Sequence, residues 1–157
     1  MSERTVTHAT FTLDRTYPAP PARVFAAFAD PAEKARWTSC HPDWRMVEHE
    51  MDFRVGGREM NRTLPPGGPE HGFEARYHDI VPNERIVYSY HMSVGDARIS
   101  ASLVTLEFEP AGGGTRLVFT EQGAFLDGHQ HPDDREAGTG IGLDRLEEIL
   151  AAELAGV

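Results

Sequence analysis

Hydrophobic and polar residues repeat with two different periods along the chain, and the change of period separates helices from strands. Residues 6–17 alternate as a half-buried strand does, until prolines end the strand. Residues 22–28 carry hydrophobic side chains at helical spacing, which predicts a short helix. A second short helix is expected to begin at Pro31, because proline suits the first turn, and to include Trp37.

The middle of the chain, from residue 44 to residue 123, alternates with period two and is interrupted by turns rich in glycine and proline. This spacing predicts about six strands joined by short turns into an antiparallel meander. Each strand has one apolar side and one mostly polar side, so the sheet needs a cover on one face only. Three strands show this clearly, with apolar positions at Ile86, Tyr88, Tyr90 and Met92, at Val104, Leu106 and Phe108, and at Leu117 and Phe119.

The C-terminal segment supplies the cover for the sheet. Leucine and isoleucine recur there at three- and four-residue spacing, which predicts a long amphipathic helix from about residue 136 to residue 154. Three glycines near its start favour either close packing of the helix on the sheet or a later start near Ile141. The predicted fold class is therefore α+β. We expect a single domain over residues 1–157, in which a curved antiparallel sheet of about seven strands wraps around one long helix.

Charge and length narrow the functions that such a domain can have. The 157 residues include 25 acidic and 15 basic ones, for a formal net charge of −10, and Lys34 is the only lysine. Nucleic acid and anionic membranes need clustered cations, so neither is an expected partner. No apolar run approaches the roughly 20 residues of a membrane span, and the N-terminus lacks the apolar stretch of a signal peptide. These features, with a single cysteine, predict a cytoplasmic protein.

Three segments in a fixed order carry a family resemblance. Residues 54–58 read Arg-Val-Gly-Gly-Arg, residues 77–88 read Tyr-His-Asp-Ile-Val-Pro-Asn-Glu-Arg-Ile-Val-Tyr, and residues 119–128 read Phe-Thr-Glu-Gln-Gly-Ala-Phe-Leu-Asp-Gly. Over about residues 8–154, this pattern resembles the SRPBCC or START-like superfamily. Within that superfamily it is similar to the bacterial homologues of the activator of heat-shock protein 90 ATPase, which are also labelled polyketide cyclase-like.

The resemblance implies a helix-grip fold, in which an incomplete barrel holds a deep apolar cavity between the sheet and the C-terminal helix. The sequence fits such a cavity, because tyrosine and phenylalanine share the apolar side of the strands with the aliphatic residues. Alternation in residues 73–77 adds Tyr77, whereas the inward side of residues 58–63 is not determined. The predicted lining consists of Trp37, Tyr77, Tyr88, Tyr90, Phe108, Phe119, Glu121, Leu143 and Leu146.

Glu121 is the most informative single residue of this lining. Alternation from Leu117 and Phe119 turns its side chain inward, where an unpaired carboxylate is costly. The carboxylate could anchor a ligand hydroxyl, act as a general acid or base, or form a structural pair with an inward arginine such as Arg62.

Three functions are compatible with the sequence. The leading hypothesis is a non-enzymatic binder of a small hydrophobic or amphipathic molecule. The first alternative is a cyclase or dehydratase acting on a polyketide or aromatic substrate, with Glu121 and a tyrosine as the acid and base. The second alternative is a regulator of a chaperone ATPase. A homodimer is compatible with each of the three.

Two further groups of residues suggest chemistry but have simpler explanations. Cys40 and His41 are adjacent, and no motif of a cysteine hydrolase surrounds them, so this segment is expected to form a pocket rim. His129 and His131 are expected to lie in a solvated loop, without the spacing of a metal site on a regular element. We therefore predict no metal site and no cofactor.

Overall fold

The computed structural model describes residues 4–38 and 43–156, which form seven strands and three helices. The two short helices follow the first strand, and the long helix ends the chain. The elements are β1 (Val6–Tyr17), α1 (Pro21–Ala29), α2 (Pro31–Thr38), β2 (Arg45–Met51), β3 (Arg58–Leu64), β4 (His71–Val81), β5 (Arg85–Val94), β6 (Ala97–Ala111), β7 (Gly114–Leu126) and α3 (Pro132–Leu154).

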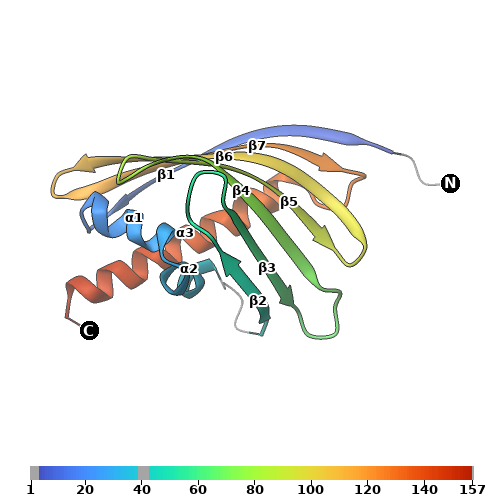
Figure 1. Ribbon diagram of the computed structural model, residues 1–157, viewed down its shortest axis with the longest axis horizontal. Coiled ribbons are helices and arrows are strands. Elements are labelled where there is room, and N and C mark those ends of the chain that lie inside the picture. The colour runs from blue at the N-terminus through green and yellow to red at the C-terminus, as the bar shows by residue number, and fades with distance from the viewer. Residues whose placement is uncertain (1–3, 39–42, 157) are drawn as a thin grey trace.

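The seven strands form one antiparallel sheet in the order β1-β7-β6-β5-β4-β3-β2. Strands β2 to β7 form the predicted meander. Strand β1 pairs with β7 along its whole length, from Val6 opposite Leu126 to Tyr17 opposite Thr115. Figure 1 shows the sheet curving over the three helices, with α3 running beneath β1, β7 and β6. The predicted fold class is confirmed.

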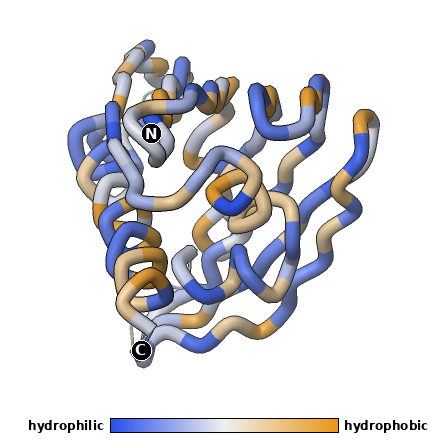
Figure 2. The backbone as a smooth tube through the Cα atoms, turned by 90° about the vertical axis from the view of Figure 1, so that its left-hand side faces the viewer, coloured by the Kyte–Doolittle hydropathy of each residue, from blue (hydrophilic) through white to orange (hydrophobic). Residues whose placement is uncertain are grey.

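We call the sheet face that carries Tyr88 and packs against the helices the inner face. Hydrophobic and hydrophilic residues alternate along the strands (Figure 2), and the predicted apolar positions of β5, β6 and β7 lie in the core, apart from the half-buried Met92. The helix α3 adds Leu143, Leu146 and Leu150 to the same core. The hydroxyl of Tyr17 donates a hydrogen bond to the backbone oxygen of Leu143 at 3.0 Å, which ties β1 to α3.

The helix α3 begins at Pro132, four residues before the predicted start, and the alternative of a start near Ile141 is wrong. His131 forms the N-cap, because its ring Nδ1 accepts a hydrogen bond from the backbone N–H of Asp133 at 3.1 Å. Pro132 suits the first position, and the acidic residues of the first turn interact favourably with the helix dipole. The predicted loop therefore ends at His131, and the extra turn places Arg135 against the sheet.

Gly142, in the middle of α3, faces α2. A Cβ atom at Gly142 would lie 3.6 Å from the ring and the backbone oxygen of Trp37, in van der Waals contact. Trp37 is itself held in place, because its Nε1–H donates to the backbone oxygen of Ala27 at 3.0 Å and its ring packs against Phe28. The helix α3 thus packs on α2 at Gly142, whereas the prediction was close packing of the glycines on the sheet. Of the three glycines, only Gly140 has a sheet residue near its Cβ position, Nη2 of Arg15 at 3.3 Å, and Gly138 has open space around it.

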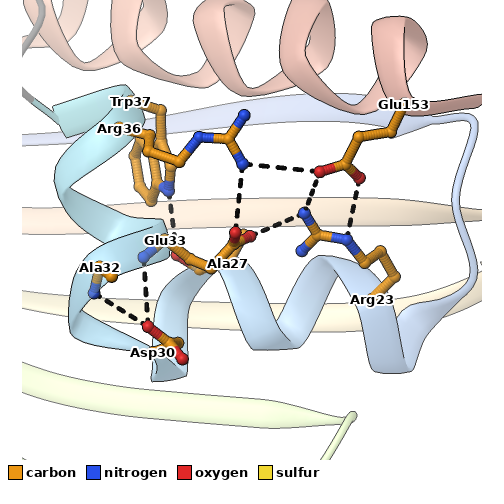
Figure 3. Close-up of polar contacts among 8 residues, drawn as sticks. All are labelled: Arg23, Ala27, Asp30, Ala32, Glu33, Arg36, Trp37 and Glu153. Atoms are coloured by element: carbon orange, nitrogen blue, oxygen red, sulfur yellow. Dashed lines mark hydrogen bonds and ion pairs between the residues drawn. The ribbon is translucent and has the colours of Figure 1, made fainter. Parts of the chain in front are cut away.

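A cluster of surface charges joins α1 and α2 to the end of α3 (Figure 3). The guanidinium of Arg23 donates two hydrogen bonds to the carboxylate of Glu153, at 2.7 and 3.0 Å, and also pairs with Glu33. Arg36 contacts the same two carboxylates. Asp30 caps α2, since its Oδ1 accepts from the backbone N–H groups of the first turn.

Two glycines allow a direct test of this packing. A Cβ atom at Gly114 would lie 2.2 Å from the backbone oxygen of Tyr17, so strands β1 and β7 cannot both keep their positions in Gly114→Ala. We expect this variant to lose about 1–3 kcal/mol of unfolding free energy or more. The exposed helical Gly138 has open space around it, and Gly138→Ala should gain about 0.5–1 kcal/mol. Urea unfolding measures both changes in unfolding free energy. If both variants gained or both lost stability, the packing described would be contradicted.

Candidate functional site

Most of the polar groups described below lie in two adjacent rows that cross the strands of the inner face. The pairing register defines each row, because residues opposite each other on neighbouring strands lie side by side on the same face. The first row contains Phe11, Glu121, Val104, Tyr88 and Tyr77, and the second contains Gly123, Ser102, Tyr90, Ala75 and Glu59.

The first polar group joins α3 to the sheet. It consists of Arg135, Glu121, Tyr90, Ser100 and Gln130, and we call it the Arg135 cluster. The Tyr90 hydroxyl donates to Oε2 of Glu121 at 2.8 Å and accepts from Nη1 of Arg135 at 2.8 Å. The same Nη1 also donates to Oε2 of Glu121, at 3.2 Å. Nη2 donates to Ser100 and Gln130, and Nε donates to Gln130. Glu121 therefore forms an ion pair with an arginine, which was one of the alternatives that the sequence left open, but the arginine belongs to α3.

Both ions of this cluster are almost fully shielded from water. The side chain of Glu121 is 1% exposed and that of Arg135 is 6% exposed. The guanidinium also lies over two rings, 5.0 Å from the ring centre of Phe125 and 5.6 Å from that of Tyr90. Burial and the Glu121 carboxylate raise the pKa of the Tyr90 hydroxyl above its usual value. The tyrosine therefore keeps its proton and acts as a donor to Glu121.

One atom of the Arg135 cluster has no partner. Oε1 of Glu121 is buried and receives no hydrogen bond from any described protein group. The hydroxyl of Ser102, in the neighbouring row, is also buried without a described partner. A buried polar atom without a hydrogen bond is unusual in a folded protein and costs free energy.

The second polar group joins α2 to the sheet. It consists of Glu59, Lys34, Tyr77 and His49, and we call it the Glu59 cluster. Oε1 of Glu59 accepts hydrogen bonds from Nζ of Lys34 and, at 2.6 Å, from the hydroxyl of Tyr77. Oε2 lies 3.2 Å from Nε2 of His49. Burial alone would raise the pKa of Glu59, but the charge of Lys34 and these hydrogen bonds lower it to about 2. Glu59 is therefore an anion at neutral pH.

Tyr88 lies between the two clusters. Its ring centre is 5.9 Å from that of Tyr77 and 6.0 Å from that of Tyr90, and Nζ of Lys34 is 5.5 Å from it. Burial raises the pKa of Tyr88 well above its usual value, and the negative charges of Glu121 and Glu59 add to this effect. Its hydroxyl makes no hydrogen bond to any residue that the structure describes.

The structure divides the predicted lining into three groups. Tyr77, Tyr88, Tyr90 and Glu121 meet around the two clusters. Trp37 and Phe108 instead pack with the aromatic rings of α1, where Phe108 lies 5.4 Å from Phe25 and 5.6 Å from Phe28. Phe119 stacks on Phe11, and Leu143 and Leu146 are buried on α3. Whether these side chains border a ligand stays a prediction.

The suggestion that Arg62 pairs with Glu121 is wrong. Arg62 contacts Glu48 at 2.8 Å and Glu70 at 3.6 Å, because alternation on β3 turns Glu59 inward and Arg62 to the other face. The partner of Glu121 is Arg135 on α3, a helix that the sequence predicted to begin at about residue 136. An earlier helix start would have revealed it, since Arg135 lies at helical spacing from Leu143.

Lys34 and Glu59 were also missing from the predicted site. The register of β3 against β4 places Glu59 opposite the inward Ala75, so the hairpin pairing is the signal that identifies it. The short helix α2 gave no sign that its lysine is buried. Cys40 and His41, expected at the pocket rim, lie outside the described residues.

A hollow of about 430 Å³ opens between β1 and the first half of α3. One of its walls is Leu13, which is paired with the inner-face residue Phe119 in the register. The hollow is lined by Leu13, Arg15, Asp133, Glu136, Ala137, Gly140, Ile141 and Asp144.

Within residues 4–38 and 43–156, no group of three histidine, cysteine or acidic side chains is arranged to hold a metal ion. In the same residues, no helix combines the length and the apolar character that crossing a membrane requires.

The curved sheet, the two short helices after β1 and the long helix packed on the sheet define a helix-grip domain of the SRPBCC superfamily. Residues 18–151 match the family described as "Activator of Hsp90 ATPase homolog 1-like protein". The chain belongs to this family.

Solved structures of bacterial proteins support this assignment. An uncharacterized protein from Rhizobium leguminosarum is 47% identical, with a TM-score of 0.91 over 96% of this chain and 99% of its own. A protein from Rhizobium loti is 49% identical, with a TM-score of 0.85 over 92% and 98%. A protein from Chromobacterium violaceum is 30% identical, with a TM-score of 0.74 over 90% and 96%. A comparison with curated proteins gave no match.

Acid should weaken the fold through Glu59. Its pKa of about 2 in the folded protein lies below the ordinary 4.5, so the ion pair contributes stability above pH 4.5. That contribution, on the order of a few kcal/mol, is lost as the pH falls from 4.5 towards 2. Urea unfolding between pH 7 and 2 should therefore give a steeper loss for the wild type than for Glu59→Gln. Parallel pH profiles would contradict the assignment.

Removing the cation of the Arg135 cluster should be costly. In Arg135→Met, Glu121 stays buried without a counter-charge, and we expect a loss of about 3–5 kcal/mol in unfolding free energy. Adding Glu121→Gln should restore much of the loss, because the uncompensated charge is then absent. The exposed Arg116, which pairs with Asp14, provides the control, and Arg116→Met should change stability little. A double variant no more stable than Arg135→Met would contradict the coupling.

Proposed function

We propose that this domain binds a small hydrophobic or amphipathic molecule between the inner face of the sheet and α3. The observation that carries the proposal is Tyr88, which lies between two buried ion-pair clusters and has a hydroxyl without a described hydrogen-bond partner. A tyrosine that only filled the core would gain from a partner for this hydroxyl. A bound molecule supplies that partner.

The surroundings of Tyr88 suit an amphipathic ligand. Aromatic and aliphatic side chains dominate the inner face, and polar atoms occur at a few defined positions, which is the usual composition of a ligand site. The hollow between β1 and α3 lies beside Leu13, which is opposite the inner-face residue Phe119 in the register.

Binding is better supported than acid–base catalysis. A cyclase or dehydratase would need Tyr90 or Glu121 to exchange a proton with the substrate. The raised pKa of Tyr90 makes it a weak acid, and its hydroxyl is already engaged on both sides, by Glu121 and by Arg135. The described tyrosines and ion pairs therefore orient a ligand more readily than they transform it.

Two conservative variants separate a binding role from a structural one. Native mass spectrometry of the purified protein first identifies a bound molecule, whose affinity is then measured by calorimetry. In Tyr88→Phe, we expect the affinity to fall about five- to tenfold while stability stays within about 0.5 kcal/mol, because only a hydrogen bond to the ligand is lost.

Tyr17→Phe is the matched control, since the Tyr17 hydroxyl donates to Leu143 and has no place in the proposed site. This variant should lose about 1 kcal/mol of stability and keep the affinity. If Tyr88→Phe instead loses stability and keeps the affinity, Tyr88 is a core residue and the proposal is wrong.

A further inference from the structure

We infer that the polar end of this site selects a hydroxyl group. The ligand is an uncharged alcohol or phenol rather than a carboxylate or a phosphate, and its hydroxyl donates a hydrogen bond to Oε1 of Glu121. This inference rests on the proposed binding function and specifies the chemistry of the ligand.

The first argument is that Arg135 has no donor left for an anion. A guanidinium has five N–H donors. Nη1 donates to Tyr90 and Glu121, Nη2 donates to Ser100 and Gln130, and Nε donates to Gln130, which makes five hydrogen bonds. A ligand carboxylate could reach Arg135 only by displacing one of these partners.

The second argument is that Glu121 offers an acceptor. Tyr90 and Arg135 both donate to Oε2, whereas Oε1 receives nothing from the described residues. A carboxylate oxygen has two lone pairs, and leaving it buried without a donor is costly. A ligand O–H removes that cost by donating a hydrogen bond to Oε1. An ether or a carboxylate oxygen at the same place has no proton to donate and would put a second acceptor next to Oε1.

The third argument is the balance of charge on the inner face. Arg135 is neutralised by Glu121, and Lys34 by Glu59, on the two sides of Tyr88. At the edge of the same face, Arg15 of β1 is paired with Asp144 of α3. An anion would be buried without a counter-charge, which proteins avoid, while a neutral hydroxyl adds no charge.

Ser102 favours a hydroxyl over other donors. Its own hydroxyl is buried without a described partner on the inner face, one strand and one row away from Glu121. A Cβ atom at Gly123 would lie 2.8 Å from this oxygen and 2.9 Å from the ring of Phe125, so the glycine keeps a methyl group from crowding the Ser102 hydroxyl. A ligand hydroxyl can donate to Glu121 and accept from Ser102, whereas an ammonium group cannot accept.

Three probes of equal chain length test the inference on the wild-type protein. Decanol can donate to Glu121, decyl methyl ether cannot, and decanoate carries a negative charge. We expect calorimetry at pH 7 to show decanol binding at least about tenfold more tightly than either of the other two. Equal affinities for decanol and the ether, or tighter binding of decanoate, would overturn the inference and leave the proposed function standing.

The variant Glu121→Gln adds a reversal that loss of folding cannot imitate. Arg135 then keeps its charge without a counter-charge, so the affinity for decanoate should rise above that for decanol, and the preference for decanol over the ether should shrink to about threefold or less. Glu153→Gln is the matched control, because Glu153 pairs with an arginine on the outside of the domain. It should keep the wild-type order of the probes.

Different results would contradict the proposed function and the inference about the hydroxyl group. If no probe binds and no molecule co-purifies with the protein, the site does not bind small molecules, and both are wrong. If a molecule co-purifies while no probe binds, its chemistry decides: a hydroxyl compound without acidic groups supports the inference, and a carboxylic acid or a phosphate ester contradicts it.

Discussion

Two carboxylates on the inner face of the sheet each require a cationic partner, and the rest of the domain is arranged around these two ion pairs. Burying an unpaired carboxylate costs several kcal/mol, so Glu121 and Glu59 are stable there only with partners. Neither partner comes from the sheet, because Arg135 belongs to α3 and Lys34 to α2. The two ion pairs therefore fasten both helices to the sheet.

The same two pairs give the apolar core its polar positions. Each pair includes a tyrosine, and the two tyrosines flank Tyr88, whose own hydroxyl is left without a described partner. The arrangement saturates the guanidinium of Arg135 but not the carboxylate of Glu121. Beside Tyr88 the inner face is therefore balanced in charge and keeps an acceptor that no described residue uses, which is the basis for the ligand chemistry proposed above.

Much of the fold could be predicted because local rules decide it. Alternation predicted the first strand, the meander and the inward direction of Glu121, and helical spacing predicted α1 and the core stripe of α3. The start of α3 was less certain, because three glycines lower helix propensity while the cap at His131 raises it. Which residues of β3 face inward could not be predicted from that strand alone, because the answer depends on its pairing with β4.

The sequence by itself determined which side chains face inward, since period two and period 3.6 depend only on neighbours along the chain. Tertiary structure alone decided which charges meet. Glu121 and Arg135 are close in sequence but lie on different elements, and Lys34 is 25 residues from Glu59. Their pairing depends on how α2 and α3 cross the sheet, and that crossing follows from packing such as Gly142 against Trp37. Because hydrogen-bond partners are defined by distances between elements, only the folded chain shows that Oε2 of Glu121 is engaged by Tyr90 and Arg135, whereas Oε1 has no partner among the described residues.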